Sequence, residues 1–101
     1  MKSVIFHPNA EAEFDNTISF YEKRQTGLGL DFKNEILRSI SVIHDAPQRW
    51  PFYKFGLKKY TLHRFPFTIF YLDELECIWI VAIAHNFLRP DYWKERLAKK
   101  P

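Results

Sequence analysis

The sequence has little of the residue types on which several kinds of function depend. It contains one cysteine, Cys77, so no internal disulfide can form, and the apolar run around it favours a small core residue over a nucleophile. The three glycines match no phosphate-binding loop, and we therefore expect no nucleotide cofactor. The four histidines lie far apart without the spacing of a metal site, so we expect no metal either.

Long apolar segments are also missing. The longest run, residues 77–84, is far shorter than the roughly 20 residues of a membrane helix, so we interpret it as a buried strand. The first residues show no apolar stretch with a small-residue cleavage pattern, so no signal peptide is indicated and we expect a cytoplasmic location. The length of 101 residues is that of one domain, residues 1–101, with a single core.

Acidic residues are scarce in the second half of the chain. Residues 1–50 contain six Lys or Arg and seven Asp or Glu, whereas residues 51–101 contain nine and five. Within residues 54–64 there are four cations and no acid. This basic segment predicts a surface that meets an anionic partner, either nucleic acid or an acidic protein. The alternative is a solvated edge strand protected by its lysines.

Apolar periodicity predicts the order β-α-α-β-β-β. Residues 2–7 form a short strand, and a helix capped by Asn9 follows and ends near Gly27. Three- and four-residue spacing marks a second helix from Gly29 to about His44. Strands are expected at 57–64, 66–72 and 77–85. We therefore predict an α+β fold in which a helix hairpin packs on one face of a largely antiparallel four-stranded sheet.

The last predicted strand is apolar on both faces. Strict alternation places Ile78, Ile80, Ala82 and Ala84 on one face and Trp79, Val81 and Ile83 on the other. The helix hairpin can cover only one face, so the other needs a cover from the C-terminal segment, another subunit or a different protein. Tyr92, Trp93 and Leu97 are candidates for that cover.

No pair of carboxylates is placed for acid–base catalysis, and Glu11 and Glu13 are expected to be solvating residues on different faces of their helix. What remains is a set of basic and aromatic residues. Lys and Arg stabilise charge on a phosphate, His and Tyr move protons, and aromatic rings stack on bases, so this set is compatible with RNA cleavage. The set comprises Lys54, Lys58, Lys59, His63, Arg64, His85, Arg89, Tyr92 and Trp93.

Several motifs in this order resemble the RelE/ParE superfamily of bacterial toxins, in the part often described as plasmid stabilisation proteins. They are Phe20-Tyr21-Glu22 before Gly27-Leu28-Gly29, Pro47-Gln48-Arg49-Trp50-Pro51, Arg64-Phe65-Pro66-Phe67 with Phe70-Tyr71, and Val81-Ala82-Ile83-Ala84-His85 followed by Arg89-Pro90-Asp91-Tyr92-Trp93. The resemblance spans nearly the whole chain. It implies a helix hairpin on an antiparallel sheet and a toxin of a type II toxin–antitoxin system, held inactive in a hetero-oligomer with its cognate antitoxin.

The superfamily contains two activities, and this sequence resembles them unequally. RelE-like members cleave messenger RNA on the ribosome with a set of basic residues. Lys59 and Trp93 match that pattern, but Thr61, Thr68 and Phe87 stand where the resemblance implies cations. An uncharged residue cannot stabilise the transition-state phosphate as a guanidinium does. A nuclease of this kind would rely on Lys59 with Arg64, His85 and Arg89, the last three at shifted positions.

ParE-like members lack that basic set and inhibit DNA gyrase, and the present pattern resembles them more. In this interpretation the chain is not an enzyme, and the basic segment and the tail form a docking surface. The partner-binding residues are then Lys54, Lys58, Lys59, Arg64, Trp79, Arg89, Tyr92 and Trp93. A non-toxic protein-binding module is the third hypothesis.

Overall fold

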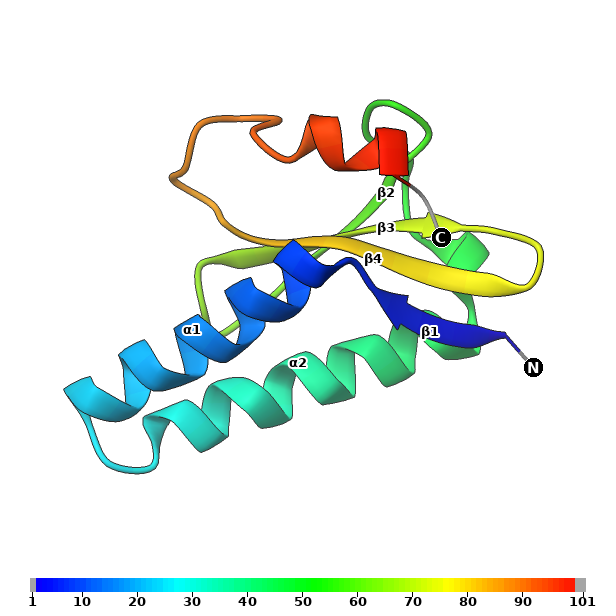
Figure 1. Ribbon diagram of the computed structural model, residues 1–101. Coiled ribbons are helices and arrows are strands. Elements are labelled where there is room, and N and C mark those ends of the chain that lie inside the picture. Colours follow the sequence, from blue (N-terminus) through cyan, green and yellow to red (C-terminus); the bar gives the residue numbers. More distant parts are fainter. Residues whose placement is uncertain (1, 100–101) are drawn as a thin grey trace.

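The computed structural model describes residues 2–99 and shows an α+β fold (Figure 1). Two helices lie on one side of a four-stranded sheet in the order β1-β4-β3-β2. β1 pairs with β4 in parallel, and the other two pairs are antiparallel. The fold therefore confirms the predicted layers and element order. The elements are β1 (Ser3–Phe6), α1 (Pro8–Arg24), α2 (Leu28–Asp45), a 3-10 helix (Pro47–Arg49), β2 (Lys58–Thr61), β3 (Phe67–Asp73), β4 (Cys77–His85) and a second 3-10 helix (Lys94–Lys99).

The first helix begins one residue earlier than its expected cap. Pro8 occupies the first turn, where its missing N–H costs no hydrogen bond, and His7 is the N-cap. The Asn9 backbone N–H donates to His7 Nδ1 over 3.0 Å, so Asn9 is not the capping residue that the sequence predicted.

Glu22 joins the two helices of the hairpin. Its carboxylate accepts the backbone N–H groups of Gly27 and Gly29 at 3.0–3.1 Å, which satisfies donors at the start of α2. Gly29 also lies so close to α1 that a Cβ there would be 2.5 Å from the Ile18 carbonyl oxygen. The Phe20-Tyr21-Glu22 and Gly27-Leu28-Gly29 motifs therefore hold the hairpin closed.

The main core lies between the helices and the sheet. Phe32, Ile36 and Ile43 of α2 are fully buried there against residues of β3, β4 and the connection between β2 and β3. Aromatic rings make many of these contacts, with Phe32 5.1 Å from Phe67 between ring centroids. The core residues contributed by the sheet side are Leu62, Phe65, Phe67, Ile69, Tyr71, Ile78, Ile80 and Ile83.

β4 does not keep the strict alternation that the sequence predicted. Ile80 pairs with Tyr71 and Ala82 with Phe70, so Val81 is an extra residue on β4 and forms a bulge. The bulge moves Ile83 to the helix side with Ile78 and Ile80, and Ala82 and Ala84 pack with Trp79 and Val81 on the other side.

The other face of the sheet is covered by the chain itself. The C-terminal segment crosses it opposite the helices (Figure 1). Trp93 is 1% exposed, and its ring centroid lies 4.7 Å from that of Phe70. Tyr92 and Leu97 pack in the same cluster, which confirms the predicted cover by the tail. The tail is therefore the cover among the three expected alternatives, and this face needs no other subunit or partner protein to bury it.

The edge strand β2 is shorter than predicted. It ends at Thr61 rather than at residue 64, and Phe52 forms an isolated antiparallel bridge with Lys58 along its outer edge. The Lys59 N–H also reaches the Pro51 carbonyl oxygen over 3.4 Å. The connecting segment therefore shields part of the edge. Within residues 2–99, no helix is long and apolar enough to cross a membrane.

Candidate functional site

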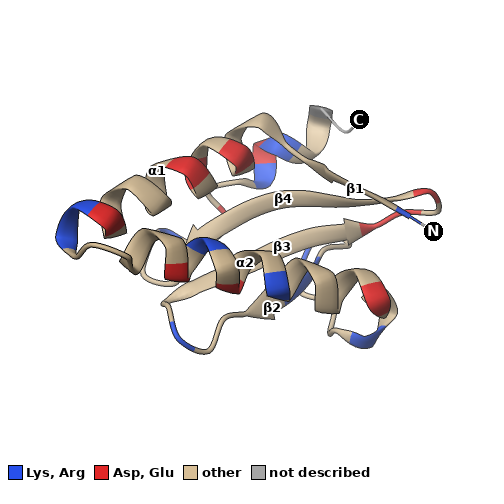
Figure 2. Ribbon diagram, turned by 90° about the horizontal axis from the view of Figure 1, so that it is seen from below, with Lys and Arg blue, Asp and Glu red and all other residues tan. Residues whose placement is uncertain are grey.

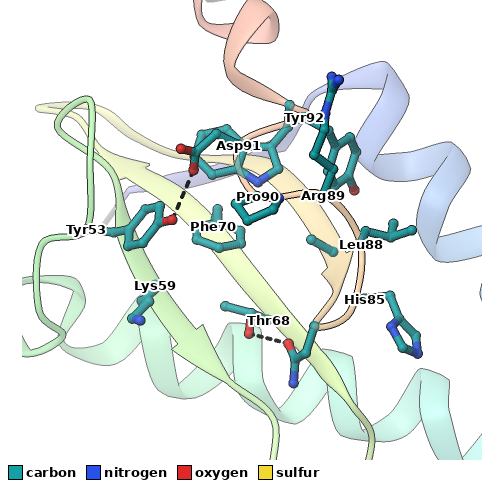
Figure 3. A pocket seen from close by; sticks show the side chains of 13 residues that line it. Tyr53, Lys59, Thr68, Phe70, His85, Leu88, Arg89, Pro90, Asp91 and Tyr92 are labelled. Atoms are coloured by element: carbon teal, nitrogen blue, oxygen red, sulfur yellow. Dashed lines mark hydrogen bonds between the residues drawn. The ribbon is translucent and has the colours of Figure 1, made fainter.

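A pocket of about 180 Å³ opens between the sheet and the segment that follows β4 (Figure 3). β2 contributes Lys59, β3 contributes Thr68 and Phe70, and β4 ends in the pocket at His85. Three of the four residues of the nuclease hypothesis, Lys59, His85 and Arg89, line this pocket. The other lining residues are Tyr53, Ala84, Asn86, Leu88, Pro90, Asp91, Tyr92 and Trp93.

Thr68 and Asn86 give the pocket an uncharged polar part. Thr68 Oγ1 donates to Asn86 Oδ1 over 2.8 Å, and the Thr61 hydroxyl lies 3.3 Å from that of Thr68. Thr61 and Thr68 are the positions where the RelE-like pattern implies cations. In this chain they bond to each other and to an amide, so this part of the pocket is neutral.

His85 stands at the rim of the pocket. Its Nδ1 accepts the Phe87 backbone N–H over 3.1 Å, and its ring packs against Phe67 at 5.0 Å between centroids. With Nδ1 engaged as an acceptor, Nε2 is the nitrogen that carries the proton in the neutral ring. His85 is therefore oriented by local contacts, with Nε2 as a donor for a ligand.

The basic side chains of the pocket do not converge. Lys59 and His85 lie on opposite sides of Thr68, and the Arg89 side chain extends away from both (Figure 3). Acid–base catalysis on a phosphate requires its groups within hydrogen-bonding reach of the same reacting atoms. The arrangement suits contacts with an extended anionic partner better than attack on one phosphodiester bond.

Asp91 connects the tail to the loop that precedes β2. Its carboxylate accepts the Tyr53 hydroxyl over 3.0 Å and the Lys54 ammonium over 3.1 Å. Burial acts to raise the pKa of the Asp91 carboxyl, but the hydrogen bonds from Lys54 and Tyr53 outweigh it and hold this pKa below its usual value. The hydrogen bond to Asp91 also raises the pKa of Lys54. Lys54 is thus charged and already paired.

Glu13 of α1 holds the C-terminal tail at the opposite edge of the sheet, beside β4. Its carboxylate accepts the Ile83 N–H at 3.0 Å, both terminal nitrogens of Arg96 at 2.9 and 3.0 Å, and the Tyr92 hydroxyl. Arg96 also donates to the Val81 carbonyl oxygen over 3.0 Å. Since β1 pairs with β4 only as far as Ile80, this cluster satisfies strand groups beyond the end of β1.

The Glu13 cluster perturbs the groups around it. Burial raises the pKa of the Tyr92 hydroxyl, and the hydrogen bond to Glu13 raises it further. Burial acts to lower the pKa of Arg96, and its hydrogen bond with Glu13 more than compensates. Glu13 is therefore a structural acid and not the solvating residue that the sequence predicted.

Three of the predicted partner-binding residues are buried within the chain. Trp79 of β4 and Trp93 of the tail are 2% and 1% exposed, and Lys58 is 7% exposed. The Lys58 ammonium donates to the Trp50 carbonyl oxygen over 2.9 Å. These side chains hold the cover and the connecting loop in place, and in this conformation none of them presents a surface to a partner.

The remaining predicted residues lie in separate places. Arg64 is on the helix side, where its guanidinium bonds to Asp31 over 3.1 Å and its N–H to Glu35 over 3.2 Å. Lys59, Arg89 and Tyr92 gather around the pocket. The two helices carry charges of both signs (Figure 2).

Sequence reasoning did not single out Glu13, Tyr53 or Asp91 as functional. The carboxylate partners of Tyr53 and Arg96 lie 38 and 83 residues away, and no sequence spacing reports such contacts. Among residues 2–99, no group of three or more His, Cys, Asp or Glu side chains is placed to hold a metal ion.

No protein-family model and no curated protein matches the sequence. Among solved structures, a chain described as "Chromosomal ParDE TA system from P. aeruginosa" matches with a TM-score of 0.74 and 20% identity. The match covers 84% of this chain and 96% of that chain. The likeness is one of fold, and this chain therefore has the same fold as that solved chain.

Proposed function

We propose that this chain is the toxin of a type II toxin–antitoxin system and that its target is DNA gyrase. The observation that carries the proposal is the fold shared with a chain of a ParDE toxin–antitoxin system over 84% of this chain and 96% of that chain. The non-convergent cations of the pocket agree with a protein target, because docking needs complementary charge but no common reaction centre.

The cognate antitoxin is proposed to place acidic side chains on the basic surface around the pocket. Lys59 and Arg89 have no acidic partner among residues 2–99, whereas Lys54, Arg64 and Arg96 are each paired within the chain. Unpaired cations on a stable scaffold attract an oppositely charged segment with little cost of rearrangement. Lys59 and Arg89 are therefore the first residues to test.

The test is expression of the chain in bacteria without an antitoxin, followed by a supercoiling assay with purified gyrase and relaxed plasmid. We expect arrested growth, loss of supercoiling, and recovery when a cognate antitoxin is co-expressed. Lys59→Ala and Arg89→Ala should weaken the recovery by the antitoxin, and Lys33→Ala on the exposed face of α2 should not. Normal growth without an antitoxin would reject the toxin proposal and favour a non-toxic binding module.

A ribosome-dependent ribonuclease is the second candidate, because Lys59, His85 and Arg89 line one pocket. Binding to the ribosome and mRNA would then have to bring these groups together. Primer extension on ribosome-bound message after induction is the deciding measurement. New cleavage sites that disappear in His85→Ala, together with unchanged supercoiling, would replace the gyrase proposal with this one.

A further inference from the structure

The outer edge of β4 is only partly covered by a neighbouring strand. β1 pairs in parallel with residues 77–80 of β4, and the chain then turns into α1 at Pro8 (Figure 1). Among residues 2–99, no strand therefore lies beside residues 81–85 on that side, whereas β3 pairs with β4 on the other side as far as His85. An uncovered edge presents backbone N–H and C=O groups that another extended segment can bind.

Side chains of the protein occupy the first part of this edge. Arg96 donates to the Val81 carbonyl oxygen, and Glu13 accepts the Ile83 N–H, each over 3.0 Å. Peptide groups alternate in direction along a strand, so the Ile83 carbonyl and the His85 N–H point to the same open side as the Ile83 N–H. Within residues 2–99, no group bonds to either of these two. They are therefore available to a partner.

The two available groups fit one residue of a parallel segment. In a parallel pair, a residue donates its N–H to one carbonyl and accepts the N–H of the residue two positions further along. A residue opposite Ala84 would therefore bond to the Ile83 carbonyl oxygen and to the His85 N–H. An antiparallel residue opposite His85 would need its carbonyl oxygen, which already accepts the Leu88 N–H over 3.1 Å. The edge thus favours a segment that continues the direction of β1.

A groove of about 470 Å³ lies beside this edge, and we call it the edge groove. Phe20 of α1 and Leu88 of the segment after β4 line it, and each is 54% exposed. Ile83 and Phe67 line it from the face of the sheet that packs on the helices. In a segment bound opposite Ala84, the residues before and after the central one would point to this face. Two apolar side chains of the segment would then enter the groove.

The unpaired charges near the edge groove are positive. Its acidic lining residue, Glu13, is already bound to Arg96. Arg24 lies over the Phe20 ring, with Cζ 5.3 Å from the ring centre, and Arg89 belongs to the segment after β4. Neither Arg24 nor Arg89 has an acidic partner among residues 2–99. Acidic residues at the ends of a bound segment would complement these two cations.

We infer that an extended segment of the antitoxin binds in the edge groove as a short parallel strand on β4. Its backbone bonds to Ile83 and His85, its apolar side chains contact Phe20 and Ile83, and acids flank them. A helix cannot make the edge contacts, because its own backbone groups are bonded internally. The inference rests on the proposed function for the identity of the partner. It adds a site on the helix side of the sheet, away from Lys59.

The test is an NMR titration of the isotope-labelled chain with the capped peptide Asp-Glu-Val-Thr-Ile-Glu-Asp. Its Thr is designed to lie opposite Ala84, with Val and Ile in the edge groove. We expect a dissociation constant below about 1 mM and a shift of the His85 amide. Methylation of the Thr nitrogen removes the donor to Ile83 and should weaken binding about tenfold or more. Methylation of the Ile nitrogen, which faces away from β4, is the matched control and should change binding less than about twofold.

His85→Pro and His85→Ala form a matched pair of protein variants. Proline removes the edge N–H, and the pairing with β3 loses no bond because this N–H faces away from β3. Alanine keeps the N–H and removes only the imidazole. Peptide binding should fall about tenfold or more in His85→Pro and less than about threefold in His85→Ala.

A second pair of variants keeps the test valid if His85→Pro fails to fold in circular dichroism melts. Thr17 lines the edge groove, so Thr17→Trp should fill it and abolish peptide binding. Ser19 is exposed on the same helix and does not line the groove, so Ser19→Trp should leave binding unchanged.

Three results would each overturn the inference. They are an unshifted His85 amide at about 1 mM peptide, equal losses for the two methylated peptides, and equal losses in Thr17→Trp and Ser19→Trp. A dimer in sedimentation velocity that the peptide dissociates would assign the groove to a second copy of the chain. Arrested growth without peptide binding would reject this inference alone. Peptide binding by a chain that does not arrest growth would reject the toxin proposal and the antitoxin as occupant, and would support the strand site itself.

Discussion

Replacing Glu13 by Gln should destabilise the fold more than any other conservative change of an acid on the helices. Gln keeps an oxygen that can accept the Ile83 N–H, so the substitution removes chiefly the charge that faces Arg96. The side chains of Arg96 and Glu13 are 12% and 20% exposed. The loss therefore leaves a mostly buried guanidinium without its counter-ion.

The size of the effect follows from this burial. Breaking a fully buried ion pair by removing one partner costs about 3–5 kcal/mol, and we reduce this to about 2–3 kcal/mol for the remaining exposure. For a domain of this size each kcal/mol lowers the melting temperature by roughly 4–8 °C, so a fall of about 10–20 °C is expected.

Urea unfolding followed by circular dichroism measures the change, with Asp15→Asn on the exposed face of α1 as the control. The control should change the free energy of unfolding by less than about 0.5 kcal/mol. A double-mutant cycle with Arg96→Met isolates the pair, because Arg96→Met should cost less once Glu13 is already Gln. A loss in Glu13→Gln no larger than in Asp15→Asn, or strict additivity in the cycle, would refute the reasoning.

Three further predictions concern other contacts. Gly29→Ala should lower the free energy of unfolding by about 1–3 kcal/mol in urea titration, since its Cβ would lie 2.5 Å from the Ile18 carbonyl oxygen; a change as small as that of Ser41→Ala would contradict the close helix contact. The pKa of Tyr92 is raised above its unfolded value of about 10, so the stability gained from the protonated hydroxyl is complete below pH 10 and is lost as the pH rises further. Unfolding midpoints measured from pH 8 to 11 should therefore fall less steeply in Tyr92→Phe than in the unchanged protein, and parallel curves would argue against this role of Tyr92. Asp91 has a φ of +62°, which Asn tolerates, so Asp91→Asn tests the carboxylate alone; amide exchange in the segment around Lys54 should become faster, and unchanged protection would show that the pair does not hold the loop.

The elements were predictable because each has a local signal. The spacing of Phe32, Ile36, Ile40 and Ile43 marks one face of α2, and these residues lie against the sheet. The N-cap of α1 was predicted two residues too late, at Asn9 instead of His7, because Asn9 is a common cap but Pro8 fixes the first turn. Local pattern therefore located each helix and strand and misplaced some of their ends.

The faces of β4 and the anchoring of the tail were not predictable in the same way. A bulge at Val81 adds one residue and exchanges the faces of everything after it, yet its residue type carries no signal. Glu13 resembles an ordinary helix-surface acid until the fold brings Arg96 and Tyr92 to it. The pocket residues were chosen by charge and residue type, which does not tell whether Lys58 points outward or into the protein.

The parallel pairing of β1 with β4 sets the order in which the protein can be completed during synthesis. Ser3 pairs with Cys77, and Glu13 forms its ion pair with Arg96. The first strand and the first helix therefore cannot complete their contacts until nearly the whole chain has left the ribosome. A chain stopped before residue 92 would form the helix hairpin but leave Trp79 and its neighbours uncovered. Incomplete chains would therefore be prone to aggregation and open to proteases, and only a nearly full-length chain would present the pocket.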